Sequence, residues 1–418
     1  MKKRKNKKSI FKYKVLQYVT VAAWCLLITG GGIHAALSFF KNMETEIKKN
    51  DFTSMDFRYE EKFQDTLDHY PYFETLYQEE YAAPVPGLES TDILGETCSR
   101  MVPQGICIAG DYMLVTAYDT GEFFRDSENQ NRLEYRVNRS VLYVLSNQNP
   151  QKRELLTTIV LPDVNHVGGV AFDGENVWIA KSTSRQCSVI SYDVVRQAAE
   201  EKKSSYELEK YDQNVPCGVI ASFVTWHKGK LWVGTYANRT TGTGSLRGFQ
   251  VVCERTENEK VFTLEKTEDL QIPEFANGAA FMELGDQTYL LVSTSKGRHL
   301  DSELYFYKIY QDLDTGKNLY DCYGSRKFPP MAEEVVWDGD QTYLLFESSA
   351  TCYSARKFQK CSYPVDRICG FSTAKLLWQD QEIMVQQIVS IGKQICLQMM
   401  LDCAYQERKY WKRYVVFR

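Results

Sequence analysis

Residues 169–180 read GVAFDGENVWIA, and residues 223–234 read FVTWHKGKLWVG. Each stretch is a short apolar run, a turn that contains glycine, and a second run rich in β-branched and aromatic residues. This pattern is typical of an antiparallel hairpin, because such residues favour strands and glycine permits a tight turn. Four further segments share it, at residues 103–118, 277–293, 332–348 and 386–401. The hairpin is therefore a repeated unit.

The spacing of the hairpins is regular. Their turn glycines are separated by 64, 55, 56, 54 and 53 residues, and they are Gly110, Gly174, Gly229, Gly285, Gly339 and Gly392. A third apolar run follows each hairpin, such as SVLYVLS at 140–146, and most units add a fourth, such as ELLTTIVLP at 154–162. Four strands per ~50 residues, repeated six times, predict an all-β, six-bladed β-propeller.

The ends of the repeat predict how the propeller closes. The chain ends at Arg418, directly after the third run of the sixth unit. Residues 92–101 resemble the passage from an outer strand to the next blade, so we expect them to supply the missing outer strand of the sixth blade. Such pairing removes exposed strand edges. The predicted propeller domain therefore covers residues 88–418.

The inner-strand hairpins carry a family resemblance. The segments GVAFDGENVWIA and FVTWHKGKLWVG resemble the inner strands of the six-bladed propellers grouped as TolB-like, gluconolactonase-like and NHL-repeat proteins. The resemblance implies the fold and leaves the function open, because this architecture hosts both enzymes and binding modules.

The starts of the first strands predict a ligand site at one end of the channel. Aligning the six units superposes a set of polar or glycine positions, which are Gln104, Gly168, Ser222, Asn277, Glu333 and Gln386. His166 lies at the start of a blade and is a further candidate. A solvated channel lining is the simpler interpretation, and a ring of hydrogen-bonding groups for a small polar ligand is the functional one. Glu334 is expected to point away from the ring, since side chains alternate along a strand.

The ends of the second strands add a rim of mixed charge with aromatic residues, which suits a protein or glycan partner. Its members include Tyr118, Asp119, Lys181, Ser182, Tyr236, Asn238, Lys296, Arg298 and Glu347. The primary hypothesis is therefore a binding module without a cofactor for an extracytoplasmic protein, a glycan or a small polar ligand.

The alternative is a metal-assisted hydrolase or lactonase at the channel mouth. The gluconolactonase-like resemblance implies a divalent cation such as calcium, held by Glu333 and Asn277. A hard cation usually requires more than one carboxylate, and the aligned ring offers one.

The amino terminus predicts a membrane anchor. Residues 1–14 carry eight positive charges and no acid, and residues 15–40 lack Asp, Glu, Lys and Arg. The run of 26 residues exceeds the ~20 needed to cross a bilayer, and the basic residues should stay cytoplasmic. A cleaved signal peptide is the competing interpretation. Residues 41–87 are expected to form a partly helical stalk that joins an uncleaved anchor to an extracytoplasmic propeller.

Charge and cysteine content narrow the partners further. Residues 41–418 carry 42 basic and 54 acidic residues, a net charge of −12 that argues against nucleic-acid binding. Eleven cysteines follow residue 40, an odd number without C-x-x-C spacing. Buried free thiols are the favoured interpretation, and Cys352 with Cys361 is one conceivable pair.

Overall fold

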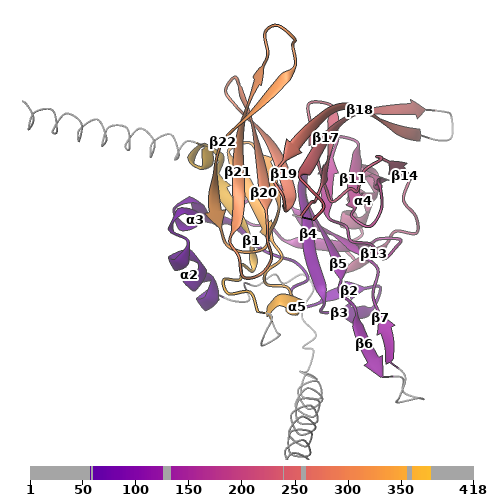
Figure 1. Cartoon of the computed structure of the whole chain (residues 1–418). Helices are drawn as coiled ribbons and strands as arrows, with labels where there is room; N and C mark the ends of the chain where they lie inside the picture. Colours follow the sequence, from indigo (N-terminus) through magenta and orange to yellow (C-terminus); the bar gives the residue numbers. More distant parts are fainter. Residues whose placement is uncertain are drawn as a thin grey trace, which may run out of the picture. The chain divides into compact units, whose positions relative to one another are not determined.

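The computed structural model describes residues 57, 60–125, 133–238, 240–255, 260–354 and 360–377. Within these residues, five antiparallel sheets surround a common axis as the blades of a β-propeller (Figure 1). The innermost strand of each blade lies beside the innermost strands of its two neighbours. The all-β propeller class predicted from the repeat is therefore confirmed.

In blades 1 to 4 the strands run outward from the axis in chain order, and in blade 5 an earlier strand is outermost. Blade 1 holds β4 (Met101–Ala109), β5 (Tyr112–Asp119), β8 (Val141–Ser146) and β9 (Leu155–Val160). Blade 2 holds β10 (Gly169–Phe172), β11 (Asn176–Lys181), β12 (Gln186–Ser191) and β14 (Gln213–Pro216). Blade 3 holds β15 (Phe223–His227), β16 (Lys230–Thr235), β17 (Gly244–Arg255) and β18 (Lys260–Ile272). Blade 4 holds β19 (Ala276–Leu284), β20 (Gln287–Thr294), β21 (Ser302–Gln311) and β22 (Asn318–Phe328). Blade 5 holds β23 (Ala332–Asp338), β24 (Gln341–Phe346), β25 (Arg367–Ser372) and, outermost, β1 (Tyr77–Pro84).

The turn glycines predicted from the repeat join the first two strands of all five blades. Gly110, Gly174, Gly229, Gly285 and Gly339 have φ values between +58° and +103°. Residues other than glycine rarely adopt this backbone conformation, which explains why the repeat places glycine there. Gly392 and the rest of the sixth unit lie outside the described residues.

The ring closes with five blades, so the prediction of six is wrong. β23 of blade 5 packs beside β4 of blade 1. A side-chain oxygen of Glu334 in β23 lies 3.0 Å from the backbone nitrogen of Ile106 in β4. A sixth blade between these strands would separate the two atoms, and the described ring leaves no position for it.

The residues before the propeller also differ from expectation. Residues 60–84, predicted as part of a stalk, form α2 (Glu60–His69), α3 (Pro71–Leu76) and β1. Phe63, Phe73 and Leu76 are fully buried in the core of blades 4 and 5, while most acidic residues of α2 face solvent. Burial of these large apolar side chains favours a docked segment over a free stalk.

The closing strand is β1, where the sequence suggested residues 92–101. Tyr77 pairs with Phe371 and Pro84 with Arg367, so the amino-terminal segment completes the last blade. Residues 91–98 instead form a hairpin of β2 (Thr91–Ile93) and β3 (Glu96–Cys98). The strand that completes the last blade is thus β1 and the blade is the fifth, whereas the sequence suggested residues 92–101 and a sixth blade.

Three insertions decorate the ring. The hairpin of β6 (Glu122–Arg125) and β7 (Leu133–Arg136) projects from blade 1 (Figure 1). Between β12 and β14, the chain forms α4 (Tyr192–Glu200) and β13 (Ser205–Glu207), and β13 pairs in parallel with β9 of blade 1. The short α5 (Thr351–Ser354) follows β24.

None of the helices among the described residues has the length and apolar character needed to cross a membrane. The predicted anchor at 15–40 and the tail at 1–14 lie outside the described residues. None of the nine described cysteines is joined in a disulfide to another described cysteine, Cys352 and Cys361 included. The suggested Cys352–Cys361 disulfide is therefore absent, and most of the nine thiols are buried as expected.

Candidate functional site

The predicted ring residues gather at one end of the axis, where inner strands begin. Asn277 Nδ2 donates a hydrogen bond to Glu333 Oε1 at 3.1 Å, which joins blades 4 and 5. Gln104 Nε2 donates to Glu347 Oε2 at 2.8 Å, which joins blades 1 and 5. We call this end the ring mouth, and its polar groups are Gln104, Gly168, Ser222, Asn277, Glu333 and Glu347. Gln386, the sixth predicted ring residue, lies outside the described residues.

Two small residues narrow the ring mouth on the side of blades 2 and 3. A Cβ built on Gly168 would lie 2.0 Å from the backbone oxygen of Ser222, so a larger residue does not fit there. Ser182 Oγ donates to this oxygen at 3.3 Å, and Ser222 Oγ accepts a hydrogen bond from the Tyr236 backbone N–H at 2.9 Å. Ser222 therefore mainly holds in place the residues that follow β11 and β16.

Glu334 points toward the axis, so the expectation that it faces away is wrong. The pairing of β23 with β24 shifts register between Ala332 and Val335, which marks a β-bulge. A bulge interrupts the alternation of side chains, and two consecutive residues can then face the same side. Glu333 and Glu334 are accordingly both buried, at 5% and 1% exposure.

The Glu334 carboxyl contacts the backbone of the inner strands of two other blades. Its Oε2 accepts hydrogen bonds from the backbone N–H groups of Ile106 at 3.0 Å and Val170 at 3.1 Å. Burial raises its pKa well above the ordinary value, and the backbone N–H groups of Val170, Ile106 and Val224 oppose that rise. Gly169 makes room for this arrangement, because a Cβ there would lie 2.7 Å from the backbone nitrogen of Val224. Glu334 therefore ties the inner strands of blades 1, 2 and 5 together.

Glu333 and Glu347 form an acidic pair at the ring mouth. Burial is the main cause that raises the pKa of Glu333, and the charges of Glu347 and Glu334 add to it. Burial also raises the pKa of Glu347 to about 7, although Gln104, Arg298 and Tyr353 favour its ionised form. Each carboxyl is thus held near another acid and away from water, which disfavours two ionised forms together.

Aromatic rings border the acidic pair. Tyr118 and His166 have ring centroids 4.3 Å apart, and the Arg298 guanidinium lies 5.0 Å from the ring centroid of Tyr353. Burial raises the pKa of Tyr118 and Tyr353, and the charge of Glu347 is the next largest cause for both. Burial likewise raises the pKa of Tyr236, and the charge of Glu333 is the next largest cause. The ring mouth therefore combines carboxyls with aromatic faces.

His166 is poorly suited to act as a general base here. Burial lowers its pKa, which makes the imidazole a weaker base, and its Nδ1 is buried without a hydrogen-bond partner among the described residues that would orient the ring. No serine or cysteine nucleophile is placed against it by the hydrogen bonds of the described chain. Its contact with Tyr118 makes it part of the aromatic border.

The two residues assigned to a metal in the alternative hypothesis bind each other. The Asn277 amide nitrogen, rather than its oxygen, faces Glu333. Across the described residues, no group of three or more His, Cys, Asp or Glu side chains is arranged to hold a metal ion. The geometry therefore gives the metal hypothesis no direct support.

Sequence reasoning found part of this site. Glu347, Tyr118, Tyr236 and Arg298 were placed at the ends of second strands but were not joined to the ring. Tyr353 was missed, because it lies in α5 outside the repeated unit. Two other rim residues take up structural contacts: Lys181 Nζ lies 2.6 Å from Asp163 Oδ2, and Asp119 accepts from Arg100 at 3.0 Å.

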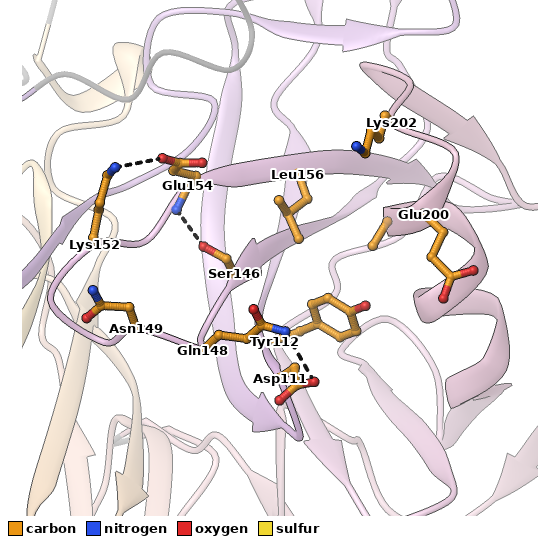
Figure 2. A pocket seen from close by; sticks show the side chains of 11 residues that line it. Asp111, Tyr112, Ser146, Gln148, Asn149, Lys152, Glu154, Leu156, Glu200 and Lys202 are labelled. Atoms are coloured by element: carbon orange, nitrogen blue, oxygen red, sulfur yellow. Dashed lines mark hydrogen bonds and ion pairs between the residues drawn. The ribbon is translucent and has the colours of Figure 1, made fainter.

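A separate cavity of about 450 Å³ lies on blade 1 beside the end of α4 (Figure 2). Its lining includes both acidic and basic side chains, and Lys152 lies 3.7 Å from Glu154. Ser146 Oγ accepts from the Glu154 backbone N–H at 2.9 Å. The cavity shares no lining residue with the ring mouth, and its polar groups face mainly one another.

No family model matches the chain, and no curated protein matches its sequence. Solved structures with a similar fold include a glutaminyl cyclase from Myxococcus xanthus, at 11% identity and a TM-score of 0.35 over 65% of this chain and 90% of that chain. A GH43_1 enzyme from Xanthomonas citri complexed with xylotriose has 9% identity and a TM-score of 0.37, over 75% of this chain and 92% of that one.

A putative 6-phosphogluconolactonase from Bacteroides fragilis has 10% identity and a TM-score of 0.30, over 60% of this chain and 80% of that chain. These similarities concern the propeller fold alone. The six-bladed groups that the sequence resembles differ from this chain in blade number. The function of this chain is therefore argued from the ring mouth alone.

Proposed function

We propose that the protein is a binding module whose ring mouth takes a small ligand bearing an ammonium group. The observation that carries the proposal is the acidic pair of Glu333 and Glu347, two carboxyls whose pKa values are both raised by burial, Glu333 also by the charge of Glu347. The described chain places an amide, Asn277, against Glu333 and no lysine or arginine in an ion pair with it. A ligand cation would supply the missing positive charge.

The energetics favour such a ligand. A positive charge beside the pair would stabilise the ionised forms of both carboxyls and relieve their mutual repulsion. Ammonium groups also bind the faces of aromatic rings, and Tyr118, Tyr236 and Tyr353 border the pair. Arg298 faces Glu347 and leaves Glu333 as the main partner for the ligand.

Thermal unfolding of the full chain tests the proposal with matched probes. Putrescine and butanediol differ in their charged groups, and glucosamine and glucose differ by one amine. The amines should raise the melting temperature, more so the more tightly they bind, and the neutral analogues should not. Glu333→Gln should abolish the rise, whereas Glu96→Gln, at an exposed residue of β3, should keep it. Equal effects of amines and neutral analogues would contradict the proposal.

The same experiment distinguishes amine binding from the metal-assisted hydrolase. Calcium or zinc should leave the melting temperature unchanged if the site takes an organic cation. A rise with either metal that Glu333→Gln removes, without any response to the amines, would favour the metal-assisted hydrolase instead.

The membrane topology is part of the proposal. Residues 15–40 would anchor the protein as an uncleaved span, with the basic residues 1–14 in the cytoplasm and the propeller outside. Protease added to intact cells should remove the propeller and spare an amino-terminal tag. Protection of the propeller would contradict this orientation, and a secreted propeller without the tag would indicate a cleaved signal peptide.

A further inference from the structure

Two cysteines of blade 2 lie on one face of adjacent strands. Cys187 in β12 pairs with Val215 in β14. The ladder continues one step past β14, since the Cys217 backbone N–H donates to the Arg185 oxygen at 2.9 Å. Residues two positions apart share a face of a strand, so Cys217 is a diagonal neighbour of Cys187. Both side chains belong to the same buried apolar cluster, and each thiol is the largest cause of the other's pKa shift.

The two sulfurs differ in reactivity. The Cys187 thiol is the main cause that lowers the pKa of Cys217. Burial opposes this shift, and backbone hydrogen bonds and the charge of Arg247 favour it. The Cys217 thiol raises the pKa of Cys187, as does burial. Cys187 is fully buried, whereas Cys217 is 6% exposed. Cys217 is therefore the sulfur that meets an oxidant first, as the thiolate is the nucleophile.

We propose that Cys187 and Cys217 are a reversible redox pair that forms a disulfide across β12 and β14. The oxidant is an external disulfide. The Cys217 thiolate attacks one of its sulfurs, forms a mixed disulfide and releases one thiolate. The Cys187 sulfur then attacks Cys217 and releases the second thiolate. The two protons of the cysteines pass to the released thiolates, and the external disulfide is reduced by two electrons.

The disulfide would link the two ends of the segment that connects β12 and β14. Between β12 and β14, residues 192–212 leave blade 2, form α4 and pair through β13 with β9 of blade 1. A link between Cys187 and Cys217 closes this segment into a loop. Closing a loop lowers the entropy of the unfolded chain, so oxidation should stabilise the protein. The extracytoplasmic location proposed above is a compartment in which such disulfides persist.

Peptide mapping tests the proposal directly. The full chain is oxidised with glutathione disulfide, its remaining thiols are blocked with iodoacetamide, and it is digested with trypsin. Cleavage after Arg185, Arg196, Lys210 and Lys228 leaves each cysteine alone in its peptide, at residues 186–196 and 211–228. The expected product is one species that joins these two peptides and disappears on reduction. Cys253, half-buried in blade 3, should be alkylated and serves as the internal control.

Stability supplies a second readout. Oxidation should raise the melting temperature of the wild-type chain by several degrees, and Cys187→Ala and Cys217→Ala should each abolish the rise. If a variant fails to fold, the peptide map of the wild type still decides the question. Stable glutathione on Cys217 of the folded protein, or alkylation of both cysteines after oxidation, would overturn the proposal.

Discussion

The Glu334 carboxyl in β23 accepts a hydrogen bond at 3.0 Å from the backbone N–H of Ile106 in β4, 228 residues earlier in the chain. The same oxygen accepts from Val170 in β10. One buried side chain thus connects the inner strands of the last blade and the first two. Because backbone N–H groups at the axis have no access to water, Glu334 is their substitute for a solvent acceptor.

Removing this acceptor should weaken the ring. Glu334→Ala leaves two buried backbone N–H groups without a partner, which should lower the free energy of unfolding by on the order of 2–5 kcal/mol. Glu334→Gln keeps an oxygen at the same place and should cost less. Urea unfolding measures both. An alanine variant as stable as the wild type, or a glutamine variant weaker than the alanine one, would contradict this role.

Arg367 of β25 is buried against the amino-terminal segment and forms an ion pair with its neighbour Asp366. Its guanidinium is 1% exposed, lies 2.9 Å from Asp366 and 2.8 Å from Glu60, and packs 3.7 Å from the ring centroid of Phe63. Arg367→Ala removes a buried ion pair with Asp366, and we expect a loss of about 3–5 kcal/mol.

Glu60→Ala is the matched control for this ion pair. The Glu60 side chain is 67% exposed, so its loss should cost less than ~1 kcal/mol. Chemical denaturation of both variants checks the prediction. Similar losses for the two would mean that the contact of Arg367 with α2, and not its buried pair with Asp366, stabilises the fold.

The stability of the propeller should depend on pH through Glu347. Its pKa is raised to about 7 in the folded protein, so the native state binds more protons than the unfolded state above the ordinary value of 4.5. Stability should therefore fall as pH rises from ~4.5 to ~7, by up to about 3 kcal/mol. The raised pKa values of Glu333 and Glu334 act in the same direction.

Glu347→Gln removes this contribution. The variant should match the wild type at pH 5 and exceed its stability at pH 8, as measured by urea unfolding at both values. Glu96→Gln, at an exposed site, should follow the wild-type pH dependence. A Glu347→Gln variant that is less stable at pH 8 would show that the carboxylate of Glu347 is stabilised in the fold.

The repeat predicted the inner hairpins because their signals are local. The glycines at 110, 174, 229, 285 and 339 require positive φ, and the flanking runs alternate as strands do. Blade number has no such local signal, because it depends on whether β23 packs beside β4 or beside another strand. That contact joins residues more than 220 positions apart, and a sixth sequence unit resembles the other five.

The ring mouth was predicted in part for a similar reason. Gln104, Asn277 and Glu333 follow from alignment of the units, but the bulge that brings in Glu334 interrupts the alternation on which the alignment rests. The Gln104–Glu347 contact spans 243 residues, and Tyr353 lies in an insertion. The closing strand β1 was missed because its exposed and half-buried residues lack clear alternation.

The central claim is that the acidic pair at the ring mouth binds a ligand cation, and proton release on binding tests it most directly. Putrescine is titrated into the full chain by calorimetry at pH 7, in buffers of different ionisation enthalpy. Because Glu347 is about half protonated at a pKa of about 7, a bound ammonium that lowers this pKa should release up to about half a proton from it. Glu347→Gln should reduce the release while putrescine still binds at Glu333. Proton uptake, binding without proton exchange, or no binding at all would contradict the account.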